Sequence, residues 1–248
     1  MKEVSESRIK QAVRKPIALT VTAETASTND DLKAAARAGA ADYTVLIAKR
    51  QTGGRGREGR SFYSEGGLYL SVLLPWRRES TPFVTHLTAV AVARAIEREA
   101  GATPTVKWVN DLFVMGKKVC GILTESVLVG ETRRLVVGIG VNVNTPTETF
   151  PKEIKNIAGS VTCDTSSLAA AILNELFSLF DDFSAERVRE SYRALCFPIG
   201  TELTVLKEDR AYDATAQGLS DDLGLIVEYP DGSRETLISG EVRVKANL

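Results

Sequence analysis

The sequence contains little histidine and cysteine, and this scarcity excludes several kinds of site. Its single histidine, His86, would have to serve any Ser-His-Asp triad, and one histidine cannot build a histidine-rich metal site. The three cysteines, Cys120, Cys163 and Cys196, are too few and too irregularly spaced for a disulfide framework or a zinc site. We therefore expect small core residues at the cysteines, a helix-surface or packing role for His86, and a reducing, cytoplasmic environment.

The chain also lacks long apolar runs and an excess of charge of either sign. No apolar stretch approaches the ~20 residues that span a bilayer, and residues 1–15 lack the apolar core of a signal peptide. Thirty-one basic and 32 acidic side chains give a formal net charge of −1, whereas nucleic-acid binders usually carry a basic surplus. We therefore expect neither a membrane nor a nucleic acid as partner, and any anion site must be built from a local group of cations.

The residues that are present predict an α+β fold in two parts. Helical periodicity and capping residues predict helices at 30–38, 85–100, 166–183 and 185–195. Short apolar runs predict strands at 17–22, 43–48, 67–74 and 134–143, and a hairpin of 106–114 with 118–128. After residue 198, short strand-like runs separated by turns indicate a small β-barrel. We expect a mixed β-sheet domain with packed helices at 1–198 and a β-barrel domain at 199–248.

A loop rich in glycine and arginine, residues 51–60, is the most unusual segment. Four glycines within seven positions allow the backbone to approach a ligand closely. Arg55, Arg57 and Arg60 offer planar donor groups that suit a carboxylate or a phosphate. No Gly-Lys-Ser/Thr follows and the next element is predicted to be a strand, so the loop is neither a P-loop nor a dinucleotide-binding turn. It is either an anion-binding loop or a flexible surface loop with solvated arginines.

Five blocks, in order along the chain, resemble the signature of biotin–protein ligases. They are residues 27–29, 51–71, 107–111, 118–123 and 138–142. The ending at 238–242 is similar to that of the family's C-terminal SH3-like barrel, so the resemblance extends over about residues 20–245. Val109 and Glu65 stand where the family usually has proline, and Phe62 where it usually has tryptophan. These departures bear on the closed conformation of the loop more than on the chemistry.

The resemblance implies a ligase that uses ATP with Mg²⁺ to form biotinyl-5′-AMP. It then transfers biotin to a lysine of a biotin carboxyl carrier protein, from acetyl-CoA carboxylase or a related carboxylase. Fewer than 27 residues precede Ser27, so we expect the short form without a DNA-binding domain and without repressor activity. Family members occur as monomers and homodimers, and both remain open. The alternatives are a lipoate or octanoate ligase or transferase, and a non-enzymatic binding module.

The resemblance also implies roles for individual residues. The residues implied for biotin are Ser27, Thr28, Asn29, Gln51, Arg55, Gly56, Arg57 and Lys118, with the apolar tail along Gly67, Gly121 and Gly140. Those implied for the nucleotide are Arg55, Arg57, Trp108, Asn110, Lys118 and Asn142, with Mg²⁺ near Asn110. The implied catalytic residues are Arg57, Lys118 and Asp111, of which Asp111 would orient and neutralise the acceptor lysine.

The residues alone also permit plainer roles. Ser27–Asn29 can be a helix cap, Asn110–Asp111 a turn pair, and Lys118 a solvated charge at a strand end. Trp108 lies in an apolar run and can be a core residue. Gly138–Gly140 can mark a β-bulge. The structure distinguishes these interpretations.

Overall fold

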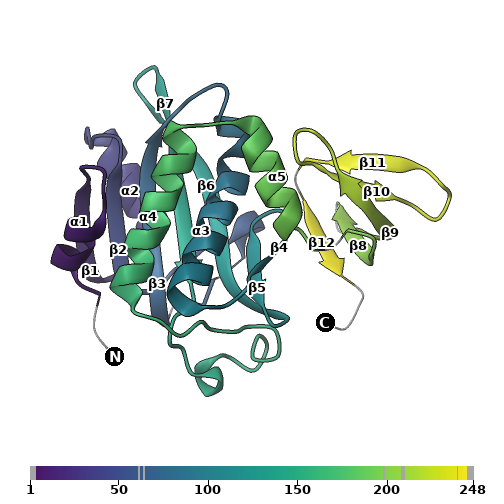
Figure 1. Cartoon of the computed structure of the whole chain (residues 1–248), viewed down its shortest axis with the longest axis horizontal. Helices are drawn as coiled ribbons and strands as arrows, with labels where there is room; N and C mark the ends of the chain where they lie inside the picture. Colours follow the sequence, from purple (N-terminus) through teal and green to yellow (C-terminus); the bar gives the residue numbers. More distant parts are fainter. Residues whose placement is uncertain are drawn as a thin grey trace.

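Two β-sheets, one large and one small, make up the fold (Figure 1). The computed structural model describes residues 4–60, 62–63, 65–197, 199–207, 210–238 and 240–244. Ser61, Ser64 and Ser239 of the signature blocks, and Pro198 at the expected domain boundary, lie outside the described residues.

The large sheet is mixed. Its strands are β1 (Ala18–Thr25), β2 (Thr44–Gln51), β3 (Glu65–Pro75), β4 (Thr105–Lys107), β5 (Asp111–Val114), β6 (Lys117–Val129) and β7 (Thr132–Val141). They lie in the order β1-β2-β3-β7-β6-β5-β4, in which β1 and β2 are parallel and every other pair is antiparallel. This arrangement confirms the expected α+β class.

Helices cover both faces of the large sheet. They are α1 (Glu6–Ala12), α2 (Thr28–Arg37), α3 (Val84–Ala100), α4 (Thr165–Asp181) and α5 (Ala185–Leu195). The main core lies between the sheet and α3 and α4, which cross one face side by side (Figure 1). On the other face, Leu32 and Ala36 of α2 pack in a second, smaller core against Leu73 of β3. None of the helices in the described ranges is both long and apolar enough to cross a membrane.

The alternation of side chains along β3 explains why two separate cores form. Leu68, Leu70 and Val72 belong to the main core, whereas Leu73 belongs to the core beneath α2. Successive side chains of a strand point to opposite faces, so Tyr69 lies on the α2 side of the sheet. On the α2 side of the sheet, unlike the main-core side, polar and small residues stand between the apolar ones.

The small sheet follows the helices and is antiparallel throughout. Its strands are β8 (Glu202–Lys207), β9 (Arg210–Leu219), β10 (Leu225–Glu228), β11 (Arg234–Leu237) and β12 (Glu241–Val244). The order is β11-β10-β9-β8-β12, an open order among the described residues and not a closed barrel. The Trp108 indole Nε1 donates a hydrogen bond to the backbone oxygen of Leu223 at 2.9 Å, which ties the two sheets together.

The helices begin and end within two residues of the sequence-based expectation, but two features differ. Glu6–Ala12 forms a helix that periodicity did not predict, anchored by the fully buried Ile9. The expected strand 106–114 is wrong, because it is divided into β4 and β5 by a turn at 108–110. The buried Trp108 and the bond from Asn110 Nδ2 to the Ile122 backbone oxygen, at 2.8 Å, hold this turn. The Trp108–Val109 peptide bond within it is cis.

His86 is a packing residue, one of the two roles expected for it. It is 7% exposed on α3, and its ring meets the Tyr192 ring edge-on at a centroid distance of 4.8 Å. Burial lowers the pKa of His86 from 6.5 to about 4, against the opposing effect of the Leu223 and Pro82 backbones. The imidazole is therefore neutral in the folded protein at neutral pH.

This burial predicts a loss of stability in mild acid. As the pH falls through 6.5, His86 takes up a proton in the unfolded chain, but in the folded chain only near pH 4. Between pH 7 and 5 we expect His86 to lower the free energy of unfolding by about 2 kcal/mol. Urea unfolding at both pH values, compared between the parent and His86→Gln, isolates this contribution. Equal losses in the two proteins would contradict it.

Candidate functional site

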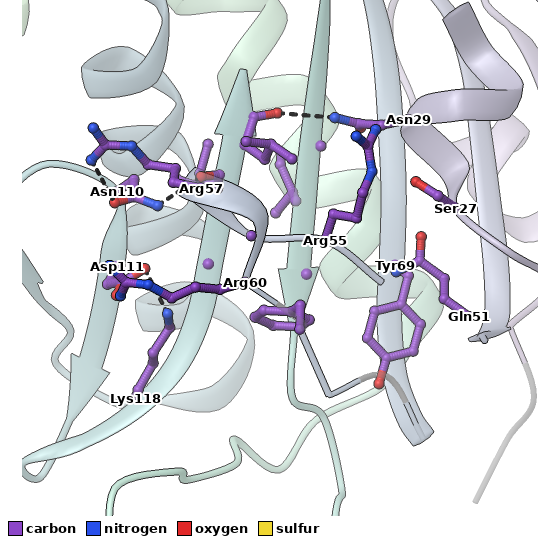
Figure 2. A pocket seen from close by; sticks show the side chains of 18 of the residues that line it. Ser27, Asn29, Gln51, Arg55, Arg57, Arg60, Tyr69, Asn110, Asp111 and Lys118 are labelled. Carbon is purple, nitrogen blue, oxygen red and sulfur yellow. Dashed lines mark hydrogen bonds and ion pairs between the residues drawn. The ribbon is translucent and has the colours of Figure 1, made fainter. Parts of the chain in front are cut away.

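A cavity opens on the face of the large sheet that carries α2. It holds about 970 Å³ of empty space, part of it continuous with solvent. The glycine-arginine loop, the start of α2 and the turn at 108–110 form its walls, and β6 and β7 form its floor (Figure 2). The polar and loop residues that were given site roles and that line it are Ser27, Thr28, Asn29, Gln51, Arg55, Gly56, Arg57, Trp108, Asn110, Asp111 and Lys118.

Glycines form the floor because of the strand register. Gly140 of β7 lies opposite Tyr69 of β3 and Gly121 of β6, and Gly138 is the next residue on the same face. A Cβ on Gly140 would stand 2.6 Å from the Phe62 ring, and one on Gly121 2.9 Å from it, so only glycine leaves room there. The pairing is continuous through Gly138 and Gly140, and the β-bulge interpretation is therefore wrong. Gly67, also expected along the tail of biotin, does not line the cavity.

Buried polar side chains form one end of the cavity. Ser27 caps α2 by accepting a hydrogen bond from the Asp30 backbone N–H, so the expected helix cap is present within the site. The Thr28 backbone N–H donates to Gln51 Oε1 at 2.8 Å. Ser71 Oγ lies 2.7 Å from Thr28 Oγ1 and 2.6 Å from Asn29 Oδ1. Because Ser27–Asn29 and Ser71 are nearly inaccessible to solvent, this end favours a ligand group that both donates and accepts hydrogen bonds.

The glycine-arginine loop folds back on itself above the floor. The Gly56 N–H donates to the Arg60 backbone oxygen at 2.7 Å, and the Phe62 N–H donates to that of Gly54 at 2.8 Å. Figure 2 shows Arg55 directed towards Asn29 and Arg57 towards Asn110, on opposite sides of the cavity. The loop therefore lines a cavity, as expected of an anion-binding loop.

Lys118 and Asp111 form an ion pair at the other end of the cavity. Lys118 Nζ lies 2.7 Å from Asp111 Oδ1, and both side chains are more than half buried. Arg57 Nη1 donates to Asn110 Oδ1 at 3.4 Å, while the Asn110 amide is fixed by the Ile122 backbone. The ion pair does not agree with the solvated-charge interpretation of Lys118. Asn110 does lie in a turn, but its amide bonds to the backbone of β6 and not to that of the turn itself.

The charge of the cavity differs sharply from that of the whole chain. Of the charged residues described along its lining, five are basic and one is acidic: Arg55, Arg57, Arg60, Lys107 and Lys118 against Asp111. A chain with a net charge of −1 thus gathers its cations around one cavity, as a local anion site requires. Within the described residues, no three histidine, cysteine or acidic side chains converge as metal ligands.

Two expected residues have other contacts. Asn142 does not line the cavity, and its Nδ2 donates to the Gly159 backbone oxygen at 2.8 Å. Trp108 is a core residue at 4% exposure and also lines the cavity. The nucleotide-binding roles of both stay predictions.

Several lining residues escaped the sequence-based assignment of roles. They are Arg60, Phe62, Tyr69, Lys107, Ile122, Leu123, Gly138, Ile139, Gly240 and Val242. The alternation of β3 placed Tyr69 on the cavity face, and this signal was available in the sequence. Gly240 and Val242 belong to the β12 end of the small sheet, and no local pattern connects them with a cavity more than 100 residues earlier in the chain.

Comparison with known proteins agrees with this geometry. Residues 21–142 match the biotin/lipoate A/B protein ligase family, and residues 199–244 match the biotin protein ligase C-terminal domain. The biotin–[acetyl-CoA-carboxylase] ligase of Mycobacterium tuberculosis is 30% identical over 200 residues, which cover 75% of this chain and 74% of that protein. The chain belongs to the biotin protein ligase family.

Two further relatives give the extent of the similarity. The bifunctional ligase/repressor BirA of Bacillus spizizenii is 31% identical over 210 residues, or 79% of this chain. The matched part spans 65% of the length of that relative. The biotin protein ligase of Aquifex aeolicus, solved with biotin and ATP, superimposes with a TM-score of 0.76 at 29% identity. That match covers 92% of this chain and 99% of the Aquifex chain.

The floor generates a prediction about Gly138. A Cβ there would stand 2.3 Å from Asn29 Oδ1, so Gly138→Ala must displace the Asn29 amide from Ser71. We expect this overpacking to cost about 1–3 kcal/mol of folding free energy, measured by urea unfolding. Gly218→Ala is the matched control, because a Cβ on this β9 glycine meets no atom within 4 Å. Equal stability of the two variants would show that the Asn29 side of the floor is not tightly packed.

Proposed function

We propose that this protein is an ATP-dependent biotin–protein ligase, which forms biotinyl-5′-AMP and transfers biotin to a lysine of a biotin carboxyl carrier protein. One observation carries the proposal: five cations surround a glycine floor that ends in a buried polar cluster. The polar cluster suits the ureido ring of biotin, the floor its apolar tail, and the cations its carboxylate together with a nucleotide phosphate. The family membership supports the same assignment.

The first step brings two anions into contact. A carboxylate oxygen of biotin attacks the α-phosphorus of ATP, the bond to the bridging oxygen breaks, and pyrophosphate leaves. Without cations, the repulsion between carboxylate and phosphate would keep the reacting atoms apart. Arg57 and Lys118 would neutralise the oxygens of the two groups, and Arg55 would hold the carboxylate side. Mg²⁺, bound with ATP near Asn110, would offset the remaining phosphate charge.

The second step transfers the acyl group to a lysine. The neutral amine attacks the biotinyl carbonyl carbon, AMP leaves, and the amine loses its proton. Asp111 would attract the incoming ammonium and accept that proton. Asp111 Oδ1 is paired with Lys118 at 2.7 Å. An adenylate phosphate that draws Lys118 towards itself would free this oxygen and so favour acceptor binding after adenylate formation.

The polar cluster favours biotin over lipoate. Biotin's ureido group donates two hydrogen bonds and accepts one, whereas the dithiolane ring of lipoate donates none. A lipoyl ring would offer no hydrogen-bond donor to the buried cluster around Thr28 and Asn29, so this end of the cavity would contribute less to lipoate binding than to biotin binding. We therefore place a lipoate or octanoate ligase or transferase second, and a non-enzymatic binding module behind both.

The remaining parts of the proposal concern partners and location. The acceptor is a biotin carboxyl carrier protein, and either a monomer or a homodimer is compatible with the site. Neither a membrane nor a nucleic acid is among the proposed partners, because the balanced charge provides no basic surplus beyond the cavity. Cytoplasmic location and domains at 1–198 and 199–248 also belong to the proposal.

Parallel assays with two candidate substrates test the proposed activity. The purified chain is incubated with ATP, Mg²⁺ and either labelled biotin or labelled lipoate, with a carrier domain as acceptor. We expect biotinyl-5′-AMP and a biotinylated carrier by mass spectrometry, and neither product from lipoate. A lipoylated carrier would favour the second candidate, and the absence of any product would refute ligase activity.

Lys118→Ala tests the charge requirement of the first step. Loss of its ammonium should slow pyrophosphate release at least about 100-fold, because one preorganised cation at the developing charge is removed. The neighbouring Lys117 is the matched control, since it does not line the cavity and its ammonium bonds to the Asn156 backbone oxygen. Lys117→Ala should keep the parent rate. Release by Lys118→Ala near the parent rate would exclude this residue from the step.

A further inference from the structure

Two carboxylates outside the signature blocks contact Arg55. Arg55 Nη2 lies 2.5 Å from Asp30 Oδ1 and 3.3 Å from Glu125 Oε2. Asp30 is in the first turn of α2, and Glu125 is on the cavity face of β6 opposite Val136. The glycine-arginine loop is thus joined by charge both to the helix that carries the polar cluster and to the floor strand.

Glu125 also holds the polar cluster itself. Its Oε2 accepts a hydrogen bond from Asn29 Nδ2 at 2.8 Å, and its Oε1 accepts one from Lys33 Nζ at 2.8 Å. Lys33 in turn pairs with Asp30 at 2.9 Å. The group contains two acids and two bases, so it adds no net charge to the cavity. One carboxylate therefore contacts both the Asn29 amide and the Arg55 guanidinium, and Asp30 holds the same guanidinium at the shorter distance.

Glu125 is charged at neutral pH. Burial alone would raise its pKa, but the hydrogen bonds from Lys33 and Asn29, with the charges of Lys33 and Arg55, outweigh burial and lower the pKa. The side chain is 23% exposed, and that of Lys33 is 15% exposed. Such partly buried, charge-assisted bonds hold a side chain in one orientation better than exposed pairs do.

We propose that Glu125, together with Asp30, is a positioning residue for biotin binding. It keeps Arg55 above the cavity and Asn29 turned towards Ser71 before the ligand arrives. This inference rests on the proposed function, because it assigns to Arg55 and Asn29 the two ends of biotin. A guanidinium that is already fixed loses little conformational entropy on binding, so the carboxylate of biotin is held more tightly.

The sign of the effect separates positioning from simple charge. Biotin is an anion, so removing the negative charge of Glu125 should tighten its binding if Coulomb repulsion alone acts. If Glu125 positions Arg55, the same change should weaken binding. Glu125→Gln suits this comparison because its amide oxygen can still accept the bond from Asn29 while the charge that holds Arg55 is lost.

The experiment measures biotin binding by calorimetry without ATP, and steady-state pyrophosphate release with ATP. For Glu125→Gln we expect the dissociation constant and the KM for biotin to rise about fivefold, with kcat changed less than about twofold. When Arg55 is already replaced by glutamine, Glu125→Gln should not weaken biotin binding further, because the guanidinium that Glu125 positions is absent. Binding that is unchanged or tighter, or losses that are additive in the double variant, would overturn the proposal.

Glu24→Gln is the matched control. Glu24 forms a 2.6 Å pair with Arg50 where β1 and β2 end, and it does not line the cavity. Glu24→Gln should leave the dissociation constant for biotin at the value of the parent protein. If Glu125→Gln proves too unstable to assay, Asp30→Asn removes the other carboxylate from Arg55 and should show the same rise in KM at nearly constant kcat. A parent protein that neither binds biotin nor releases pyrophosphate would refute the proposed function, whereas a normal parent with an unaffected Glu125→Gln would refute positioning alone.

Discussion

The hydrogen-bonded register of β3, β7 and β6 is the constraint on which the site depends. A strand places alternate residues on alternate faces, so a shift of one residue would move Gly138 and Gly140 into the core and bring Ile139 into the cavity. The branched side chains that alternate with the glycines fill the core beneath α3 and α4. Packing of one face of these strands in the core therefore determines that the glycines lie on the other face. The cavity floor requires no structural element beyond these strands.

Electrostatics then determine what the open space can hold. Cations that converge without a ligand repel one another, and this chain offsets the repulsion with carboxylates at the margins: Asp111 beside Lys118, and Asp30 and Glu125 beside Arg55. An anion that binds in the cavity therefore replaces these carboxylates as the partner of each cation, and does not meet unpaired cations. The affinity for an anion is therefore a difference between two sets of ion pairs, and each acid at the margin tunes it.

Much of this arrangement could be predicted from the sequence. The features that could not be predicted depend on contacts between distant parts of the chain. Caps and periodicity predicted α2 to α5, and the spacing of glycines and arginines singled out the loop that lines the cavity, because these signals are local. The turn at 108–110 was missed because it depends on Trp108 reaching Leu223, a partner 115 residues away. The sequence assigned Asn142 to the nucleotide, but its amide donates to the Gly159 backbone oxygen and the residue does not line the cavity. Contacts across long separations carry no signature in a single sequence.

The small sheet contributes a wall of the cavity as well as a packing surface. Gly240 and Val242 line the cavity, and the backbone oxygen of Leu223 accepts the hydrogen bond of the Trp108 indole. The small sheet is thus needed to complete a cavity whose floor is formed by β6 and β7. During synthesis on the ribosome, β12 emerges after every strand of that floor, so the cavity acquires this wall only after Gly240 and Val242 have been added.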